Sequence, residues 1–68
     1  MKAVSGKRFI RLVEERGWVL KRISGSHHIF TKQGRDETLV IPVHGNHPLK
    51  IGLQAALMKI VGLTSDDL

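Results

Sequence analysis

Apolar positions near the start of the chain recur with the period of a helix. Phe9, Leu12 and Val13 fall on one side of the segment after Ser5, while lysine, arginine and glutamate occupy most of the other positions. This spacing is typical of an amphipathic helix. We predict about three helical turns, with Ser5 as the N-cap and Gly17 as the stop, because serine caps helix starts and glycine readily adopts the left-handed conformation that ends them.

A second helical pattern begins at Leu49. Its apolar stripe, at positions i, i+3, i+4 and i+7, consists of Leu53, Ala56, Leu57 and Ile60. Gly62 follows the stripe directly and predicts the end of this helix. The last residues, 64–68, predict either a further turn with Thr64 as its cap or a frayed tail.

Between the helical patterns, β-branched and aromatic residues form three short runs. They cover residues 18–24, 27–31 and 37–42, separated by a tight turn at 24–26 and a polar turn at 32–36. Such runs predict strands, and glycine in a turn this short favours a hairpin. We therefore expect an α+β fold of order α-β-β-β-α, with a three-stranded antiparallel sheet and two helices on one face, as a single domain over residues 1–68.

Composition limits where a function can lie. A chain of 68 residues has one small core, so a substrate pocket sealed from water is not expected. Eleven lysines and arginines against six acidic residues give a net charge of +5, which favours nucleic acid as partner before an anionic membrane surface. The alternative is that the charge only keeps the protein in solution.

Other classes of function are excluded or not indicated. Without cysteine there is no disulfide or thiolate chemistry. The N-terminus has no apolar signal segment and no run is long enough for a membrane span, so a cytoplasmic location is the default expectation. No glycine-rich phosphate loop is present, and we expect no cofactor.

Two adjacent histidines are the sharpest chemical feature. His27 and His28 follow Gly25 and Ser26, a turn that delivers them into an apolar strand. Histidine can both accept and donate a proton near neutral pH, which is what metal-independent RNA cleavage requires of its base and its acid. The alternative is a histidine that only bonds backbone at a strand end.

Strand geometry allows only one of the two histidines to face a given surface. Neighbouring strand residues point to opposite faces, so His27 shares a face with Ile29 and His28 shares one with Phe30. Which of these apolar residues enters the core decides which histidine faces a substrate. The pattern leaves this open.

His44 and His47 form an H-x-x-H spacing in the loop before the last helix. Two imidazoles could bind a transition metal, but zinc generally needs a third ligand and no cysteine exists. Loop capping or phosphate contact is the favoured role, and no metal site is predicted.

Basic residues are spread along the chain, so a phosphate-binding track would have to form in three dimensions. For any one of them, plain solvation is the alternative. Lys50 opens the last helix, where free backbone N–H groups favour an anion. The candidate RNA-binding residues are Lys21, Arg22, Lys32 and Lys50.

Several motifs in order resemble a known family. These are the Gly17-Trp18 pair, the segment from Gly25 to Phe30, the segment Val40-Ile41-Pro42-Val43-His44, and a last helix closing on Val61-Gly62-Leu63-Thr64. Together they resemble the HicA, or YcfA-like, family of mRNA interferase toxins over nearly the whole chain.

The resemblance implies a fold like that of double-stranded-RNA-binding domains, cleavage of mRNA independent of translation, and neutralisation by a HicB-like antitoxin. It places the catalytic histidine of the Gly-Ser-His motif on His27, or on His28 if the motif is shifted as in some relatives. The turn glycine of the family corresponds to Gly25. The loop from His44 to Lys50 departs from the family, whose members usually carry several basic or hydroxyl residues there.

Two functions follow as hypotheses. The first is a metal-independent endoribonuclease toxin in which His27 transfers a proton. The second is a non-catalytic RNA-binding module, which would bind RNA with strong salt dependence and not cut it. An interaction domain without RNA affinity is a third possibility, and the oligomeric state is not predicted beyond a possible free monomer.

Overall fold

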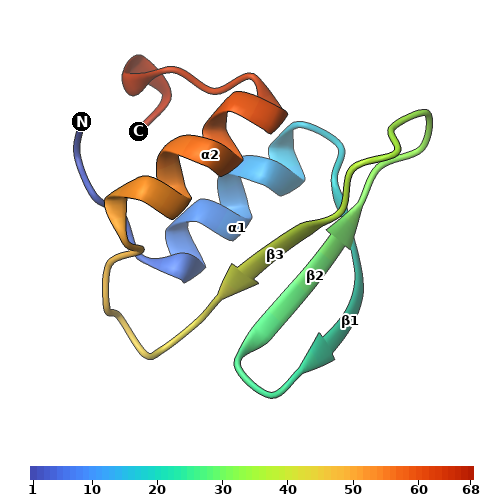
Figure 1. Cartoon of the computed structure of the whole chain (residues 1–68), viewed down its shortest axis with the longest axis horizontal. Coiled ribbons are helices and arrows are strands. Elements are labelled where there is room, and N and C mark those ends of the chain that lie inside the picture. The colour runs from blue at the N-terminus through green and yellow to red at the C-terminus, as the bar shows by residue number, and fades with distance from the viewer.

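Two helices and a three-stranded antiparallel sheet make up the fold of the computed structural model, which describes all 68 residues (Figure 1). The elements are α1 (Gly6–Glu15), β1 (Val19–Ser24), β2 (His27–Thr31), β3 (Leu39–Pro42), α2 (Ile51–Val61) and a short 3₁₀ helix, η1 (Ser65–Asp67). The predicted order α-β-β-β-α is confirmed. The first and third strands begin later than expected, at Val19 and Leu39. No helix is both long and apolar enough to cross a membrane.

The predicted helix ends are confirmed by their local geometry. The Ser5 hydroxyl oxygen accepts a hydrogen bond from the backbone N–H of Arg8, at 3.1 Å, and so caps α1. Gly17 and Gly62 have φ of 92° and 86°, in the left-handed region, where the chain leaves α1 and α2. Local sequence therefore determines where both helices stop.

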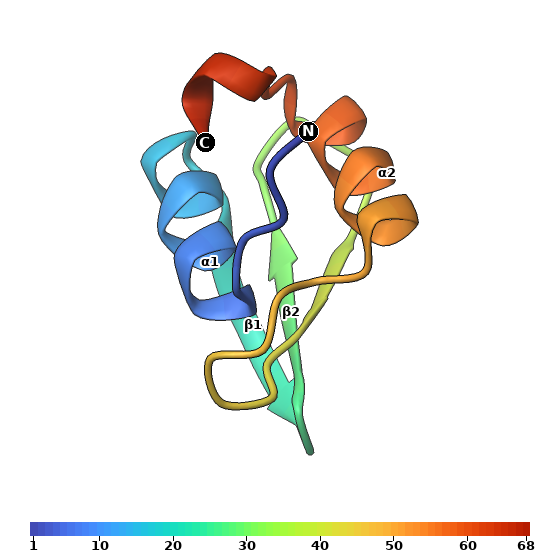
Figure 2. The ribbon, with the colours of Figure 1, turned by 90° about the vertical axis from the view of Figure 1, so that its left-hand side faces the viewer.

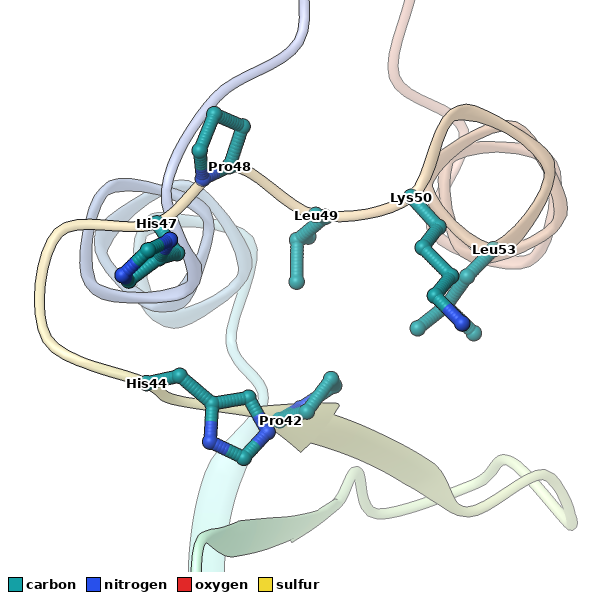
Figure 3. Close-up of a pocket in the computed structure, with 7 residues that line it drawn as sticks. All are labelled: Pro42, His44, His47, Pro48, Leu49, Lys50 and Leu53. Carbon is teal, nitrogen blue, oxygen red and sulfur yellow. The ribbon is translucent and has the colours of Figure 1, made fainter.

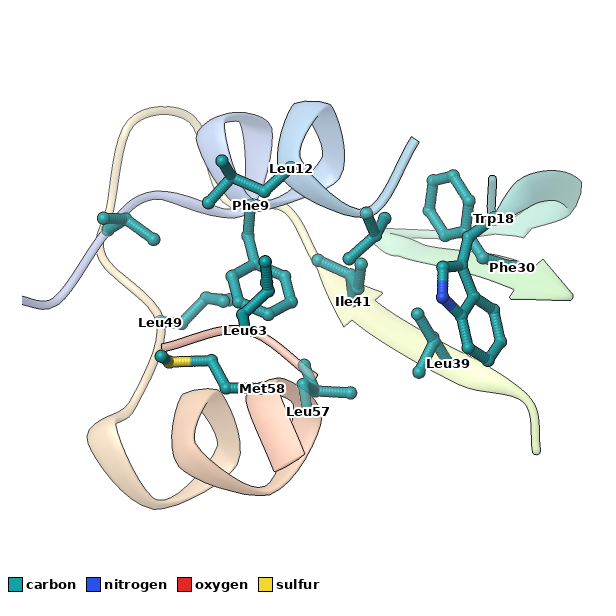
Figure 4. Packing of buried hydrophobic residues seen from close by; sticks show 12 residues of the cluster. Phe9, Leu12, Trp18, Phe30, Leu39, Ile41, Leu49, Leu57, Met58 and Leu63 are labelled. Atoms are coloured by element: carbon teal, nitrogen blue, oxygen red, sulfur yellow. The ribbon is translucent and has the colours of Figure 1, made fainter. Parts of the chain in front are cut away.

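The core lies between the two helices and one face of the sheet (Figure 4). Phe9 and Val13 of α1 and Leu57 and Met58 of α2 pack with Phe30, Leu39 and Ile41 of the sheet. Trp18, at the entry to β1, is also buried. Both helices thus cover the same face, as the two-layer prediction required.

The buried face of α2 differs from the predicted stripe. Ala56 is exposed, whereas Gln54 is 0% exposed and lies among apolar residues. The amide of Gln54 is satisfied there: its oxygen accepts from the N–H of Val4 at 2.9 Å and its nitrogen donates to the carbonyl oxygen of Lys2 at 2.7 Å. A buried polar group is tolerated because both of its ends are bonded, and this partner segment could not be foreseen from α2 alone.

The N-terminal segment also fixes the loop before α2. The N–H of Leu49 donates to the carbonyl oxygen of Val4 at 2.8 Å, and Ser5 forms an isolated β-bridge with Pro48. Gln54, the first residues of the chain and the loop at residues 43–50 are therefore held together. Figure 2 shows the N-terminal segment running between the two helices.

Strand β1 extends beyond the helices and is exposed along its whole length. Its large apolar side chains Val19, Leu20 and Ile23 are 65%, 43% and 56% exposed. The two helices therefore cover β2 and β3 and leave β1 uncovered, and the turn that joins β1 to β2 projects beyond them (Figure 1).

Candidate active site

The register of the sheet decides which histidine faces the solvent. His27 pairs with Ser24 on β1 and with Pro42 on β3, and directly paired residues place their side chains on the same face. Phe30 pairs with Leu39 and is 1% exposed in the core, so it defines the helix-covered face. By alternation, His27 lies on the opposite, open face of β2, where its side chain is exposed.

His28 lies on the covered face. It pairs with Ile23 and with the fully buried Ile41, and it is half-buried. Its Nδ1 atom is buried without a hydrogen-bond partner. His28 thus borders the core. Ile29 and Phe30 are both buried, at 8% and 1% exposed, but only Phe30 belongs to the core cluster under the helices.

The turn before His27 positions it at the end of the sheet. Gly25 has φ of 59°, which glycine adopts without strain, and a Cβ there would meet no atom within 4 Å. The carbonyl oxygen of Ser26 accepts from the N–H of Val43 at 2.8 Å, so the pairing of β2 with β3 continues one step past the strands. The turn predicted at Gly25 and Ser26 is therefore anchored on both sides.

A shallow pocket of about 320 Å³ lies beside this end of β3 (Figure 3). Its chemistry comes from His44, His47 and Lys50, and its remaining walls are Pro42, Pro48, Leu49 and Leu53. Pro42 is also the cross-strand partner of His27. Pro42 thus pairs with the exposed His27 and also forms a wall of the pocket.

All four histidines gather at one end of the molecule, which we call the histidine end: His27, His28, His44 and His47. Both helices begin there, since Gly6 of α1 lies against Pro42 and Val43, and Lys50 of the pocket precedes α2 (Figure 2). A Cβ on Gly6 would collide with the carbonyl oxygen of Pro42, so glycine permits this close approach.

The electrostatics of the histidine end favour an anion. The positive end of a helix macrodipole lies at its N-terminus, and neither helix has an acidic residue in its first turn. The first N–H groups of a helix have no intrahelical partner, and at the start of α2 no side chain caps them either. Lys50 makes no ion pair.

The opposite end, which we call the acidic end, carries every carboxylate side chain of the protein: Glu14, Glu15, Asp36, Glu37, Asp66 and Asp67. Two of its arginines form ion pairs. Arg16 pairs with Asp67 at 3.1 Å, Arg35 pairs with Glu37 at 2.9 Å, and Arg35 also lies over the ring of Trp18.

The predicted RNA-binding residues do not all come together. Arg22 lies on the open face, paired with Ile29, and Lys50 lines the pocket. Lys21 is exposed at the bulge of β1 between Leu20 and Arg22. Lys32 lies at the acidic end, where its ammonium donates to the carbonyl oxygen of Arg16 at 2.7 Å.

The side chains of His44 and His47 are not joined by further metal-binding groups. No three histidine, aspartate or glutamate side chains converge anywhere in the molecule. The two imidazoles instead line the pocket with Lys50. The sequence indicated both histidines, but it contained no signal that Pro42 would connect them to His27.

Fold and site together define a small basic α+β protein with histidines exposed at one end of its sheet. The chain belongs to the HicA toxin family: the family model for the HicA toxin of bacterial toxin–antitoxin systems matches residues 6–63. The resemblance drawn from its motifs is thereby confirmed, and membership implies an antitoxin partner. No curated protein matches the chain significantly.

Proposed function

We propose that this toxin is an endoribonuclease that cleaves mRNA with His27 as a proton-transfer group. The observation that carries the proposal is the position of His27 on the open face, at the end of the molecule where no carboxylate lies. A phosphodiester can approach this face without repulsion, and an imidazole there can accept or donate a proton. Family membership supports the same reading.

Phosphate contacts would come from cations on the same side. Arg22 lies two pairing steps from His27 and on the same face of β1 and β2, and Lys50 lines the pocket together with Pro42. Lys21, at the bulge of β1, is exposed and close to Arg22 in the chain. Lys32 has a different role in this proposal, because its ammonium holds the end of α1.

We expect a HicB-like antitoxin to cover the open face. Strand β1 is the exposed edge of the sheet beside β2, and an unpaired strand edge is the kind of surface that pairs with another chain. An acidic partner would also neutralise the histidine end and exclude RNA from His27.

The test is cleavage of end-labelled RNA by the purified protein, in chelator, analysed on a denaturing gel. His27→Ala is expected to lower the cleavage rate by about 10²–10⁴-fold, the usual contribution of a general acid or base. The matched control is His28→Leu, which changes the neighbouring histidine on the covered face and is expected to stay within about tenfold of the parent.

Two outcomes would contradict the proposal. If the parent binds RNA at low salt and does not cut it, the protein is an RNA-binding module. If folded His27→Ala cleaves at the parental rate, the proton-transfer role does not belong to this residue. Circular dichroism and thermal unfolding of each variant establish that it is folded.

A further inference from the structure

Cleavage of RNA by proton transfer needs two groups, and His27 is only one of them. A base removes the proton of the ribose 2′-hydroxyl, and an acid protonates the leaving 5′-oxygen. Carboxylates cannot fill the second role here, because all six lie at the acidic end. The candidates near His27 are the groups that line the pocket.

The continuation of β3 places His44 on the same face as His27. The bond from Val43 to Ser26 extends the pairing of the strands past Pro42. A Val43 methyl group, Cγ2, lies 3.2 Å from where a Cβ on Gly6 of α1 would stand, so Val43 faces the helices. Because side chains alternate along an extended chain, the next residue, His44, faces the open side.

Pro42 sets the spacing between the two histidines. It is the direct partner of His27 and forms a wall of the pocket together with His44, whose ring lies beside it in Figure 3. His44 is thus a diagonal neighbour of His27, across β2 and the continuation of β3, a relation in which the two Cα atoms lie roughly 7–8 Å apart. From a backbone spacing of this order both imidazoles can reach one phosphate group, one on the side of its attacking oxygen and one on the side of its leaving oxygen.

We propose, on the basis of the ribonuclease function above, that His44 is the second proton-transfer group of the reaction and acts on the same phosphodiester as His27. One imidazole takes the 2′-hydroxyl proton as that oxygen attacks phosphorus. The bond from phosphorus to the 5′-oxygen breaks, and the other imidazolium donates its proton to this oxygen. The products are a 2′,3′-cyclic phosphate and a 5′-hydroxyl, and proton exchange with water restores both histidines.

His47 and Lys50 have a different task in this arrangement. The turn that closes with the N–H of His47 donating to the carbonyl oxygen of His44, at 3.0 Å, carries His47 to the far side of the pocket (Figure 3). From there His47 and Lys50 can bind an adjacent phosphate of the RNA. Their loss would therefore weaken binding and leave the chemical step intact.

The test compares His44→Ala with His47→Ala, a matched control in which a histidine of the same loop and pocket is removed. Both residues are exposed, so both variants are expected to fold like the parent. His44→Ala should lower kcat by about 10²–10⁴-fold with little change in KM, whereas His47→Ala should mainly raise KM. Product analysis should show the cyclic phosphate.

A modified substrate separates proton transfer from a structural role. In an RNA whose scissile 5′-oxygen is replaced by sulfur, the leaving group departs without being protonated. One of the two variants His27→Ala and His44→Ala should then recover most of the parental rate, and the other should not.

The inference is overturned if folded His44→Ala keeps a kcat within tenfold of the parent, if His47→Ala loses as much kcat, or if the sulfur substrate rescues neither or both variants. Each of these results contradicts the role of His44 alone. The proposed ribonuclease function is still supported if the parent cleaves RNA and His27→Ala is inactive. A parent that does not cut RNA removes both proposals.

Discussion

At the acidic end, Arg16 and Arg35 each pair with a carboxylate, whereas at the histidine end no side chain forms an ion pair. The acidic end joins the end of α1, the loop after β2 and η1 through exposed polar contacts. The histidine end is held by buried groups instead, among them Gln54 and Leu49. Its positive charge thus remains available for a ligand.

The two ends of the molecule are held by different kinds of contact, exposed ion pairs at the acidic end and buried hydrogen bonds at the histidine end. Exposed ion pairs contribute little to stability, so the acidic end mainly neutralises its own charge. Holding the loop of His44 and His47 through backbone and amide hydrogen bonds leaves its ionisable side chains free. Three changes test this contrast, in order of decreasing expected effect.

The largest effect is expected from Gln54→Leu. The change leaves the N–H of Val4 and the carbonyl of Lys2 without their partner, which should lower the free energy of unfolding by about 1–3 kcal/mol. Because the carbonyl oxygen of Val4 also accepts a hydrogen bond from the N–H of Leu49, the loop at residues 43–50 should loosen and KM for RNA should rise. Urea denaturation and cleavage kinetics measure the two effects.

The control for this change is Gln33→Leu, which removes the other glutamine from an exposed position in the loop between β2 and β3. It should change the free energy of unfolding by no more than about 0.5 kcal/mol. Equal losses in the two variants would show that the buried amide has no special role in holding the histidine end.

The next effect concerns RNA affinity. Removing the charges of Arg22 and Lys50 by substitution with glutamine should delete two phosphate contacts, which makes the salt slope shallower by about 1.4 and weakens binding roughly 25-fold at 0.1 M salt. Arg16→Gln with Lys32→Gln removes the same charge at the acidic end and should leave the slope unchanged. Filter binding to single-stranded RNA over a salt series distinguishes the pairs, and equal slopes would mean that net charge alone governs binding.

The smallest effect is expected at Asp67. The N–H of Thr64, assisted by the nearby Arg16, lowers the pKa of the Asp67 carboxyl below its usual value. A lowered pKa in the folded state stabilises the protein above the ordinary aspartate pKa, and this contribution disappears as the pH falls through the folded value.

Asp67→Asn should therefore lose less stability than the parent as the pH falls below the ordinary aspartate pKa and through the lowered pKa of the folded protein. Asp66→Asn, at a neighbouring residue that pairs with no side chain, serves as control and should follow the parent curve. Thermal unfolding at several pH values measures the difference, and identical curves for both variants would contradict the role assigned to this end.

Much of the fold follows from local sequence. Ser5, Gly17 and Gly62 end the helices where predicted, because capping and left-handed geometry depend on only a few neighbouring residues. The predictions of the strand boundaries and of the buried face of α2 were less accurate. Gln54 is buried in place of Ala56, and the pattern of α2 alone does not predict this because the hydrogen-bond partners of Gln54 are about 50 positions away.

The candidate site divides in the same way. Local sequence is enough to predict that Gly25 and Ser26 form a turn, that histidines follow it, and that only one of two adjacent strand histidines can lie on a given face. It could not choose between His27 and His28, because Ile29 and Phe30 are both apolar. In the folded protein Phe30 packs under the helices, which places His27 on the open face and His28 on the covered face.

His44 and Pro42, the cross-strand partner of His27, line one pocket only once the chain is folded. Seventeen positions separate His27 and His44 in the chain (44 − 27). Their relation depends on the register of β2 with β3 and on Pro42, which pairs with His27 and also lines the pocket. Register is decided by which faces are buried, and burial depends on both helices at once. For that reason the sequence specified the chemical groups, and packing decided on which face and at which end of the molecule each of them lies.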